Sequence, residues 1–287
     1  MKPPVVGYHS PSSVDEALRL LAAHENVRVL AGGQSLMAML NMRFAFPDHL
    51  VDINGLQELG YIRDDGGNVV IGALTRQRDV EFSTVVQARL PLLAEAILQV
   101  GHRQTRNRGT VGGSLCQLDP AAEIPTVAMA MDAVITVANH GGTRQIAMSD
   151  FPAGYMTPSM EPDELLTAIS FTPWPTGHGW SFIEFARRHG DFAIVSVAVL
   201  IAFDAAGNIA RASITLGGVG SGPVRMSEAE AVLIGSRADD ATLARAAQLC
   251  AAIDASSDTY VPAWYRQRLA GVLSRRALDS AISRAQR

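Results

Sequence analysis

Two short segments, each holding two adjacent glycines and a serine, constrain the fold of this chain most. They are Gly32-Gly33-Gln34-Ser35 and Gly112-Gly113-Ser114. Glycine adopts positive φ angles without strain and lets an anion approach the backbone closely. Successive backbone N–H groups in such a turn form a concave anion site, which a following helix strengthens. The two turns together predict a grip on the two phosphates of a dinucleotide, although each segment could also be only a tight turn.

Neither segment has the G-x-G-x-x-G pattern, so the sequence does not predict a Rossmann dinucleotide fold. Serine hydrolase chemistry is not indicated either, because the chain has no G-x-S-x-G nucleophile elbow. A module that binds a sugar nucleotide could use the same turns and is an open alternative.

The residues around the first segment predict a compact βαβ-like unit. Ser13-Val14-Asp15-Glu16 has the spacing of a capping box, and the helix that it begins should run to about His24. Residues 27–30 have the pattern of a buried strand, and a second helix should start near Ser35. Residues 49–53 are the next expected strand. The first glycine turn therefore lies at a strand-to-helix junction.

The rest of the chain mixes strand and helix patterns, which predicts an α+β fold. Expected strands are 68–74, 133–139, 164–172, 192–203 and 209–216, and expected helices are 80–86, 92–100, 228–234, 241–255 and 262–284. The polar stretch 102–108 reads as a surface loop. The Pro- and Gly-rich stretch 173–179 is the strongest boundary signal, because both residues interrupt regular structure. It divides the chain into a first domain at 1–175 and a second at 176–287.

Charge and cysteine content exclude several classes of protein. The net charge of −4 argues against a nucleic-acid partner. The chain has two cysteines and no CxxC pair, so alone it cannot hold an iron–sulfur cluster or a four-cysteine zinc site. Its seven histidines show no HxH or HxxxH spacing, and we expect no metal site. Any redox function must depend on an organic cofactor or on a partner.

The hydropathy pattern predicts no transmembrane segment. The longest apolar run, 192–203, is shorter than the about 20 residues that a bilayer span needs. The start of the chain lacks the apolar region of a signal peptide. We expect a cytoplasmic protein, which would be peripheral to the inner membrane face only through a complex.

Five motifs carry a resemblance that covers the chain from end to end. They are Ala31-Gly32-Gly33-Gln34-Ser35-Leu36, Thr110-Val111-Gly112-Gly113-Ser114-Leu115, Asp119-Pro120-Ala121-Ala122-Glu123-Ile124-Pro125, Arg187-Arg188-His189-Gly190-Asp191-Phe192-Ala193 and Tyr265-Arg266-x-x-Leu269-x-x-x-Leu273. The set resembles the FAD-binding medium subunits of the molybdenum hydroxylases, a family that includes the carbon monoxide dehydrogenase medium chain and the FAD domain of xanthine dehydrogenase. The resemblance implies a PCMH-type FAD-binding domain of two subdomains, about 1–56 and 57–175, and a smaller α/β C-terminal domain.

The same resemblance assigns site residues by position. The two glycine segments would bind the FAD pyrophosphate and ribityl chain: Ala31, Gly32, Gly33, Gln34, Ser35, Leu36, Thr110, Val111, Gly112, Gly113 and Ser114. Val100 and Gly101 would lie against one side of the isoalloxazine. Phe192 would shield the other side, although it could also be a core residue of its strand. Glu123, where the family usually has aspartate, would contact ribityl or ribose hydroxyls, and the backbone of Leu166 would contact the pyrimidine edge.

Some positions depart from the family pattern or allow two interpretations. Ile183 stands where the xanthine dehydrogenase version carries a lysine near the flavin, and Gly190 replaces an acidic residue there. Arg103, Arg106 and Arg108 could offset the pyrophosphate charge or contact a partner, or they could only line a solvated loop.

The resemblance implies an FAD-carrying electron-transfer subunit with no catalytic residue and no metal ligand of its own. Molybdopterin would lie on a large partner subunit and two [2Fe–2S] clusters on a small one, in a complex expected to be a dimer of heterotrimers. The FAD should be non-covalent, because Gln34 occupies the first segment and neither segment contains histidine. The alternatives are a self-sufficient FAD-dependent oxidase and a scaffold subunit without flavin.

Overall fold

A small parallel sheet with connecting helices forms the N-terminal part of the chain. The computed structural model describes residues 2–285. Three strands pair in the order β1 (Gly7–His9), β3 (His49–Asp52) and β2 (Val27–Leu30), and all run parallel. α1 (Val14–Ala23) connects β1 to β2, and α2 (Leu36–Asn41) connects β2 to β3. The prediction of a βαβ-like unit with the first glycine segment at a strand-to-helix junction is confirmed.

α1 begins at the predicted capping box, but one of the two hydrogen bonds of the box is shifted by one residue. The Ser13 side chain accepts a hydrogen bond from the backbone N–H of Glu16 at 3.2 Å. The Glu16 carboxylate accepts from the backbone N–H of Ser12 at 2.7 Å rather than from that of Ser13. Both carboxylate and hydroxyl therefore satisfy helix-entry donors, as a capping box does, but the reciprocal bond closes one residue earlier.

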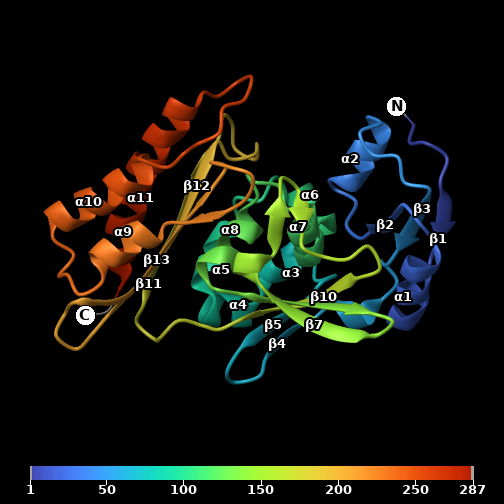
Figure 1. The fold of residues 1–287 in the computed structure, drawn as a ribbon. Helices are drawn as coiled ribbons and strands as arrows, with labels where there is room; N and C mark the ends of the chain where they lie inside the picture. The colour runs from blue at the N-terminus through green and yellow to red at the C-terminus, as the bar shows by residue number, and fades with distance from the viewer. Residues whose placement is uncertain (1, 286–287) are drawn as a thin grey trace.

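A five-stranded antiparallel sheet occupies the centre of the molecule (Figure 1). Its strands run in the order β4 (Ile62–Asp64), β5 (Val69–Gly72), β10 (Leu165–Phe171), β6 (Val134–Asn139) and β7 (Gly142–Ala147). Short helices cover one face of it: α3 (Gln77–Phe82), α4 (Thr84–Arg89), α5 (Pro91–Ala96), α6 (Arg103–Arg108), α7 (Val111–Gln117) and α8 (Glu123–Ala130).

The C-terminal sheet lies between two sets of helices. Its antiparallel order is β11 (Gly179–Phe185), β12 (Val195–Phe203), β13 (Ile209–Gly217) and β14 (Val224–Arg225). The helices α9 (Ser227–Leu233), α10 (Asp240–Ala251) and α11 (Ala263–Arg284) cover one face, and α5 and α8 lie against the other (Figure 1). Alternate residues of β12 therefore enter two different cores, which explains why its sequence is almost continuously apolar.

The remaining short elements are η1 (Gln57–Leu59), η2 (Met148–Asp150), β8 (Pro152–Gly154) and β9 (Thr157–Pro158). The α+β fold class is confirmed. In residues 2–285, none of the helices combines the length and the hydropathy that a membrane span requires.

Several predicted elements differ from the observed ones. The single helix expected over 80–86 is two helices, because Ser83 has an extended backbone and its side chain caps α4 by accepting from Val86 N–H at 3.3 Å. The stretch expected to be a loop at 102–108 is helix α6. The expected helix at 92–100 ends at Ala96 as α5, and the strand expected from residue 192 begins at Val195. Strands β1, β4, β8, β9 and β14 were not predicted because each has only two or three residues, and β7 was not predicted because it is largely polar. β11 was also not predicted.

Candidate functional site

The loop between β2 and α2 carries the first glycine segment and lines a cavity. Gly33 has a φ of +73°, which residues with a side chain rarely adopt. Within residues 2–285, no hydrogen-bond acceptor faces the backbone N–H groups of Gly32, Gly33 and Gln34. The cavity beside them has a volume of about 260 Å³ and is lined by Leu30, Ala31, Gly32, Gly33, Gln34, Met37, Asp52, Asn54 and Arg108. Free amide donors beside a cavity form the kind of concave anion site that binds phosphate.

Polar side chains from the end of β3 and from α6 complete this cavity. Asn54 donates to the carbonyl of Ala31 at 2.7 Å and accepts from Arg76 at 2.8 Å. The same Arg76 donates to the carbonyl of Arg108 at 2.6 Å. Burial alone would raise the pKa of Asp52, but hydrogen bonds from Tyr8 and Asn54 and the charge of Arg108 lower it overall. A carboxylate, an amide and a guanidinium therefore face one cavity.

Asp52 and Asn54 were not identified from the sequence. A signal existed, because Asp52 ends and Asn54 follows a parallel strand next to the strand that leads into the glycine turn. The carboxyl ends of β2 and β3 lie at the same edge of the sheet, and ligands of parallel sheets bind outside that edge.

The two glycine segments are brought together by a close backbone contact. A Cβ atom at Gly32 would lie 2.3 Å from the carbonyl oxygen of Arg108 and 2.9 Å from the Cα of Gly109. Only glycine fits such an approach, and Arg108 and Gly109 lead directly into the second segment. Segments about 80 positions apart in sequence numbering therefore meet at Gly32.

The second glycine segment is a helix start and not an open turn. Thr110 is the N-cap of α7, and its side chain accepts from Gly113 N–H at 3.0 Å. Val111 N–H and Gly112 N–H donate to the carbonyls of Thr75 and Ala73. These amides are already used, so the expectation of a second concave amide site is wrong. Gly113 and Ser114 are the partly exposed members of this segment.

Gly112 has a packing role of its own. A Cβ atom at this position would lie 2.7 Å from the Cβ of Ala73 and 2.8 Å from its carbonyl oxygen. The glycine thus allows α7 to pack directly on the chain that follows β5. This contact explains the first glycine of the segment without a ligand.

Arg106 holds the loop that precedes α6. It is buried, forms an ion pair with Glu81 at 2.9 Å and donates to the carbonyls of Val100 and Gly101 at 3.1 and 3.4 Å. The interpretation of Arg106 as a residue of a solvated loop is therefore wrong, whereas a pyrophosphate or partner contact stays a prediction. Its role is to set the position of Val100 and Gly101, the latter with a φ of +47°.

Phe192 lies at the surface of the molecule. Its side chain is 67% exposed, so the interpretation of Phe192 as a core residue is wrong. Nearby, a Cβ atom at Gly190 would lie 2.3 Å from the ring of His102. The glycine that departs from the family pattern therefore allows the segment of Phe192 to touch the start of α6. Ile183, the other departure, packs into the C-terminal core.

Two carboxyl groups with raised pKa values lie on α8 and on the C-terminal sheet; Glu123 is buried and Glu184 is partly exposed. Burial raises the pKa of Glu123 to about 7, and the charge of Asp119 adds to this. Burial, followed by the charge of Glu123, raises the pKa of Glu184 on β11 to about 8. Across the sheet Glu184 pairs in register with Ser196. Within residues 2–285, Glu184 Oε2 and Ser196 Oγ are buried without a hydrogen-bond partner, so this patch can accept polar groups of a ligand.

Leu166 differs from the other predicted site residues because its side chain is in the core, 2% exposed. It lies next to a bulge in the pairing of β10 with β6. Only its main chain is left for a ligand contact, as the resemblance implies.

Two consecutive parts of the chain each match a known protein family. Residues 4–174 match the family described as the FAD binding domain in molybdopterin dehydrogenase. Residues 180–281 match the CO dehydrogenase flavoprotein C-terminal domain.

Curated relatives match over the full length. The 6-hydroxypseudooxynicotine dehydrogenase complex subunit alpha of Paenarthrobacter nicotinovorans is 39% identical over 100% of this chain and 97% of its own length. The carbon monoxide dehydrogenase medium chain of Afipia carboxidovorans is 38% identical over 100% of both chains. Among solved structures, a chain of carbon monoxide dehydrogenase from Hydrogenophaga pseudoflava superposes with a TM-score of 0.97 at 36% identity, covering 100% of both chains.

Proposed function

The chain belongs to the FAD-binding medium-subunit family of the molybdenum hydroxylases, and on that premise we propose that it carries FAD in a heteromeric enzyme and passes electrons to an external acceptor. The cavity beside Gly32 and Gly33 carries the proposal, because it combines free amide donors with the guanidinium of Arg108. Its volume of 260 Å³ is below the about 300–1,000 Å³ of typical ligand pockets, so it suits the diphosphate part of FAD rather than the whole molecule.

The residues of this chain would bind and orient the cofactor. The amides of Gly32, Gly33 and Gln34 would donate to phosphate oxygens, and Arg108 would offset their charge. Glu123 and Ser114 would contact the ribityl or ribose hydroxyls. The isoalloxazine would be bordered by Val100, Gly101, Phe192 and the main chain of Leu166. The other residues of the two segments would shape the site: Ala31, Ser35, Leu36, Thr110, Val111, Gly112 and Gly113. When bound, FAD accepts and donates electrons singly or in pairs.

We also propose specific partners. Relatives are named as subunits of complexes, and Cys116 and Cys250 are both free and far apart in sequence. Electrons would therefore come from [2Fe–2S] clusters on a small subunit, fed by molybdopterin on a large one, in a dimer of heterotrimers. The exposed Phe192 segment and the start of α6 would face the small subunit, since they border the proposed flavin position.

The test of this function compares the isolated chain with the complex. We expect the full chain to bind FAD but to oxidise no aldehyde, purine or carbon monoxide. Turnover should appear only after co-expression with cluster and molybdenum subunits. Steady turnover by the isolated chain would show a self-sufficient oxidase, and a chain that stays colourless after incubation with FAD would show a scaffold subunit.

Arg108 gives a test of the cavity itself. Arg108→Gln should weaken FAD binding about tenfold or more, because a charge-assisted hydrogen bond contributes about 1.5–3 kcal/mol. Arg103→Gln is the matched control, since Arg103 is exposed on the same helix and does not line the cavity. Fluorescence titration of FAD into stripped protein measures both. Equal affinities of the two variants would place the phosphates elsewhere.

A further inference from the structure

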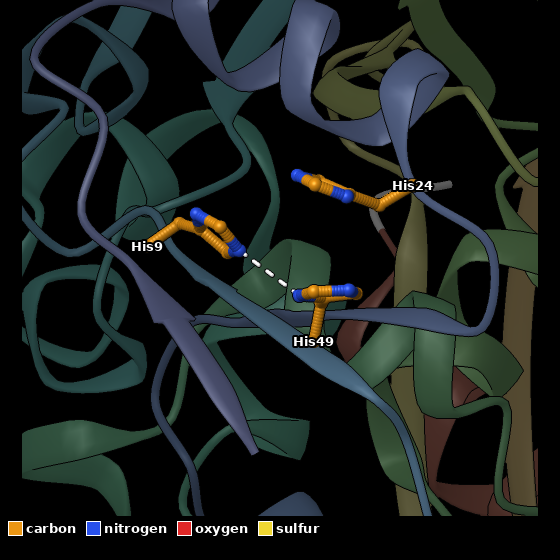
Figure 2. A group of neighbouring side chains, drawn as sticks. All are labelled: His9, His24 and His49. Carbon is orange, nitrogen blue, oxygen red and sulfur yellow. Dashed lines mark hydrogen bonds between the residues drawn. The ribbon is translucent and has the colours of Figure 1, made fainter.

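Three histidines from separate parts of the sequence meet at one edge of the N-terminal sheet (Figure 2). His9 lies on β1, His24 follows α1, and His49 begins β3. One ligating nitrogen from each can be chosen so that all three lie within 4.8 Å of one another. His9 Nε2 and His49 Nδ1 are 3.1 Å apart. All three side chains are partly exposed, so an ion can reach them.

The sheet register explains why two of the rings converge. His49 is the register partner of Gly7, and His9 follows Gly7 by two residues, so His9 and His49 point to the same face. A Cβ atom at Gly7 would lie 2.5 Å from His49 Nδ1. The absence of a side chain at Gly7 therefore gives the His49 ring room to lean toward His9.

The third ring comes from the end of a helix that covers this face. His24 is the C-cap residue of α1, and its ring lies 4.2 Å from that of His49 and 4.9 Å from that of His9, centroid to centroid. The last carbonyls of a helix carry a partial negative charge, which favours a cation there.

We propose that His9, His24 and His49 bind one divalent transition-metal ion, and that Zn²⁺ is a fitting occupant. Imidazole suits such borderline ions, whereas Mg²⁺ and Ca²⁺ prefer oxygen ligands. A tetrahedral ion with Zn–N bonds of about 2.0–2.1 Å needs nitrogens about 3.3 Å apart. The pair at 3.1 Å is already close to this spacing, and the third ring must move closer by turning out of its stack. The fourth position would be open to solvent.

This site is separate from the FAD cavity and would be structural. His49 is at the amino end of β3, whereas Asp52, which lines the cavity, is at its carboxyl end. The ion would tie β1 and β3 to the end of α1. Since the unfolded chain holds no preformed site, the binding free energy would stabilise this part of the fold.

The test uses the full chain without an affinity tag, stripped of metal by a chelator. Titration with Zn²⁺ in a calorimeter should show one ion per chain, and Co²⁺ should give the intense visible absorption of tetrahedral coordination. His24→Gln should weaken Zn²⁺ binding at least about tenfold, since losing even an outer partner of a metal ligand costs about 10–100-fold. His140→Gln, which changes an exposed histidine outside the cluster, should bind like the wild type.

Two further readouts keep the test decisive. Zn²⁺ should raise the Tm of the wild type by several degrees and leave that of His24→Gln unchanged, while FAD content stays equal in both. His9→Gln repeats the comparison at the sheet edge if His24→Gln does not fold. Zn²⁺ binding of equal strength in wild type and in the cluster variants, or no binding near one ion per chain, would overturn the proposal without affecting the FAD assignment.

Discussion

Gly33 differs from the other residues of the first segment in its backbone conformation. Its φ of +73° places it in the left-handed region, and a Cβ atom there would lie 3.2 Å from Met37 Cγ. A side chain would therefore strain the loop whose amides face the cavity. Gly66 has a similar φ of +87° in an exposed turn, where a Cβ atom would have no neighbouring atom within 4 Å.

Gly33→Ala and Gly66→Ala should thus have similar costs in stability but different effects on the cofactor. Each should lower the free energy of unfolding by about 1–2 kcal/mol, because both force an L-residue into the left-handed region. Only Gly33→Ala should lose FAD, measured as the ratio of flavin absorbance to protein absorbance after gel filtration. Full FAD content in Gly33→Ala would show that this loop is only a turn.

Glu184 makes a prediction about pH. Burial and the charge of Glu123 raise its pKa from 4.5 to about 8 in the folded chain. Between these values the folded state keeps a proton that the unfolded state has released, so the free energy of unfolding falls as pH rises. In the FAD-free protein, Glu184→Gln should flatten this decline between about pH 4.5 and 8, as measured by urea unfolding.

Glu228→Gln serves as the control for that experiment, because Glu228 is an exposed residue of α9. It should leave the decline unchanged. A Glu184→Gln variant with the same pH dependence as the wild type would show that Glu184 is ionised in the fold.

At the scale of the elements, α11 holds the segment that leads to β12. Arg266 is buried and donates to the carbonyls of Ile194 and Gly218, both at 2.6 Å, and it also pairs with Asp258. This contact explains the arginine of the Tyr265-Arg266 motif. Its guanidinium hydrogen-bonds both to the chain just after Phe192 and to the residue that follows β13.

Arg266→Met should therefore cost about 3 kcal/mol or more of unfolding free energy, because it leaves buried polar groups without partners. Arg275→Met changes the same helix, but its partners Asp240 and Asp279 are largely exposed, so its cost should stay within about 1 kcal/mol. Urea unfolding of both variants makes the comparison. Similar losses would mean that Arg266 contributes no more than a surface ion pair.

At the scale of the whole molecule, the cofactor should be held without a covalent bond. The cavity has no histidine, cysteine or tyrosine among its lining residues in the part of the chain that the structure describes. Acid precipitation of the FAD-loaded chain should release the flavin into the supernatant, where its absorbance is read. Yellow colour that stays in the pellet would contradict this and would call for a search for the attached residue.

The α+β class, the βαβ-like unit and the C-terminal hairpin and helices could all be predicted from the sequence. These features depend on local signals such as the Ser13 cap, the alternation of strands and the turn at 204–208, which act between residues close in the chain. The resemblance likewise depended on local motifs, and the family that it predicted is confirmed. Short helices were harder, because Ser83 ends one helix and caps the next within a single helical pattern.

Contacts between distant segments were decided only by the tertiary structure. The sequence alone could not show that Gly32 touches Arg108, that Asp52 and Asn54 face the cavity, or that the amides of the second segment are already bonded. Histidine spacing along the sequence also did not indicate that His9, His24 and His49, which lie in three separate parts of the chain, come together. The spacing of residues in the sequence indicates which side chains share one face of a helix or strand. Strand register and close backbone approach decide which of these faces meet.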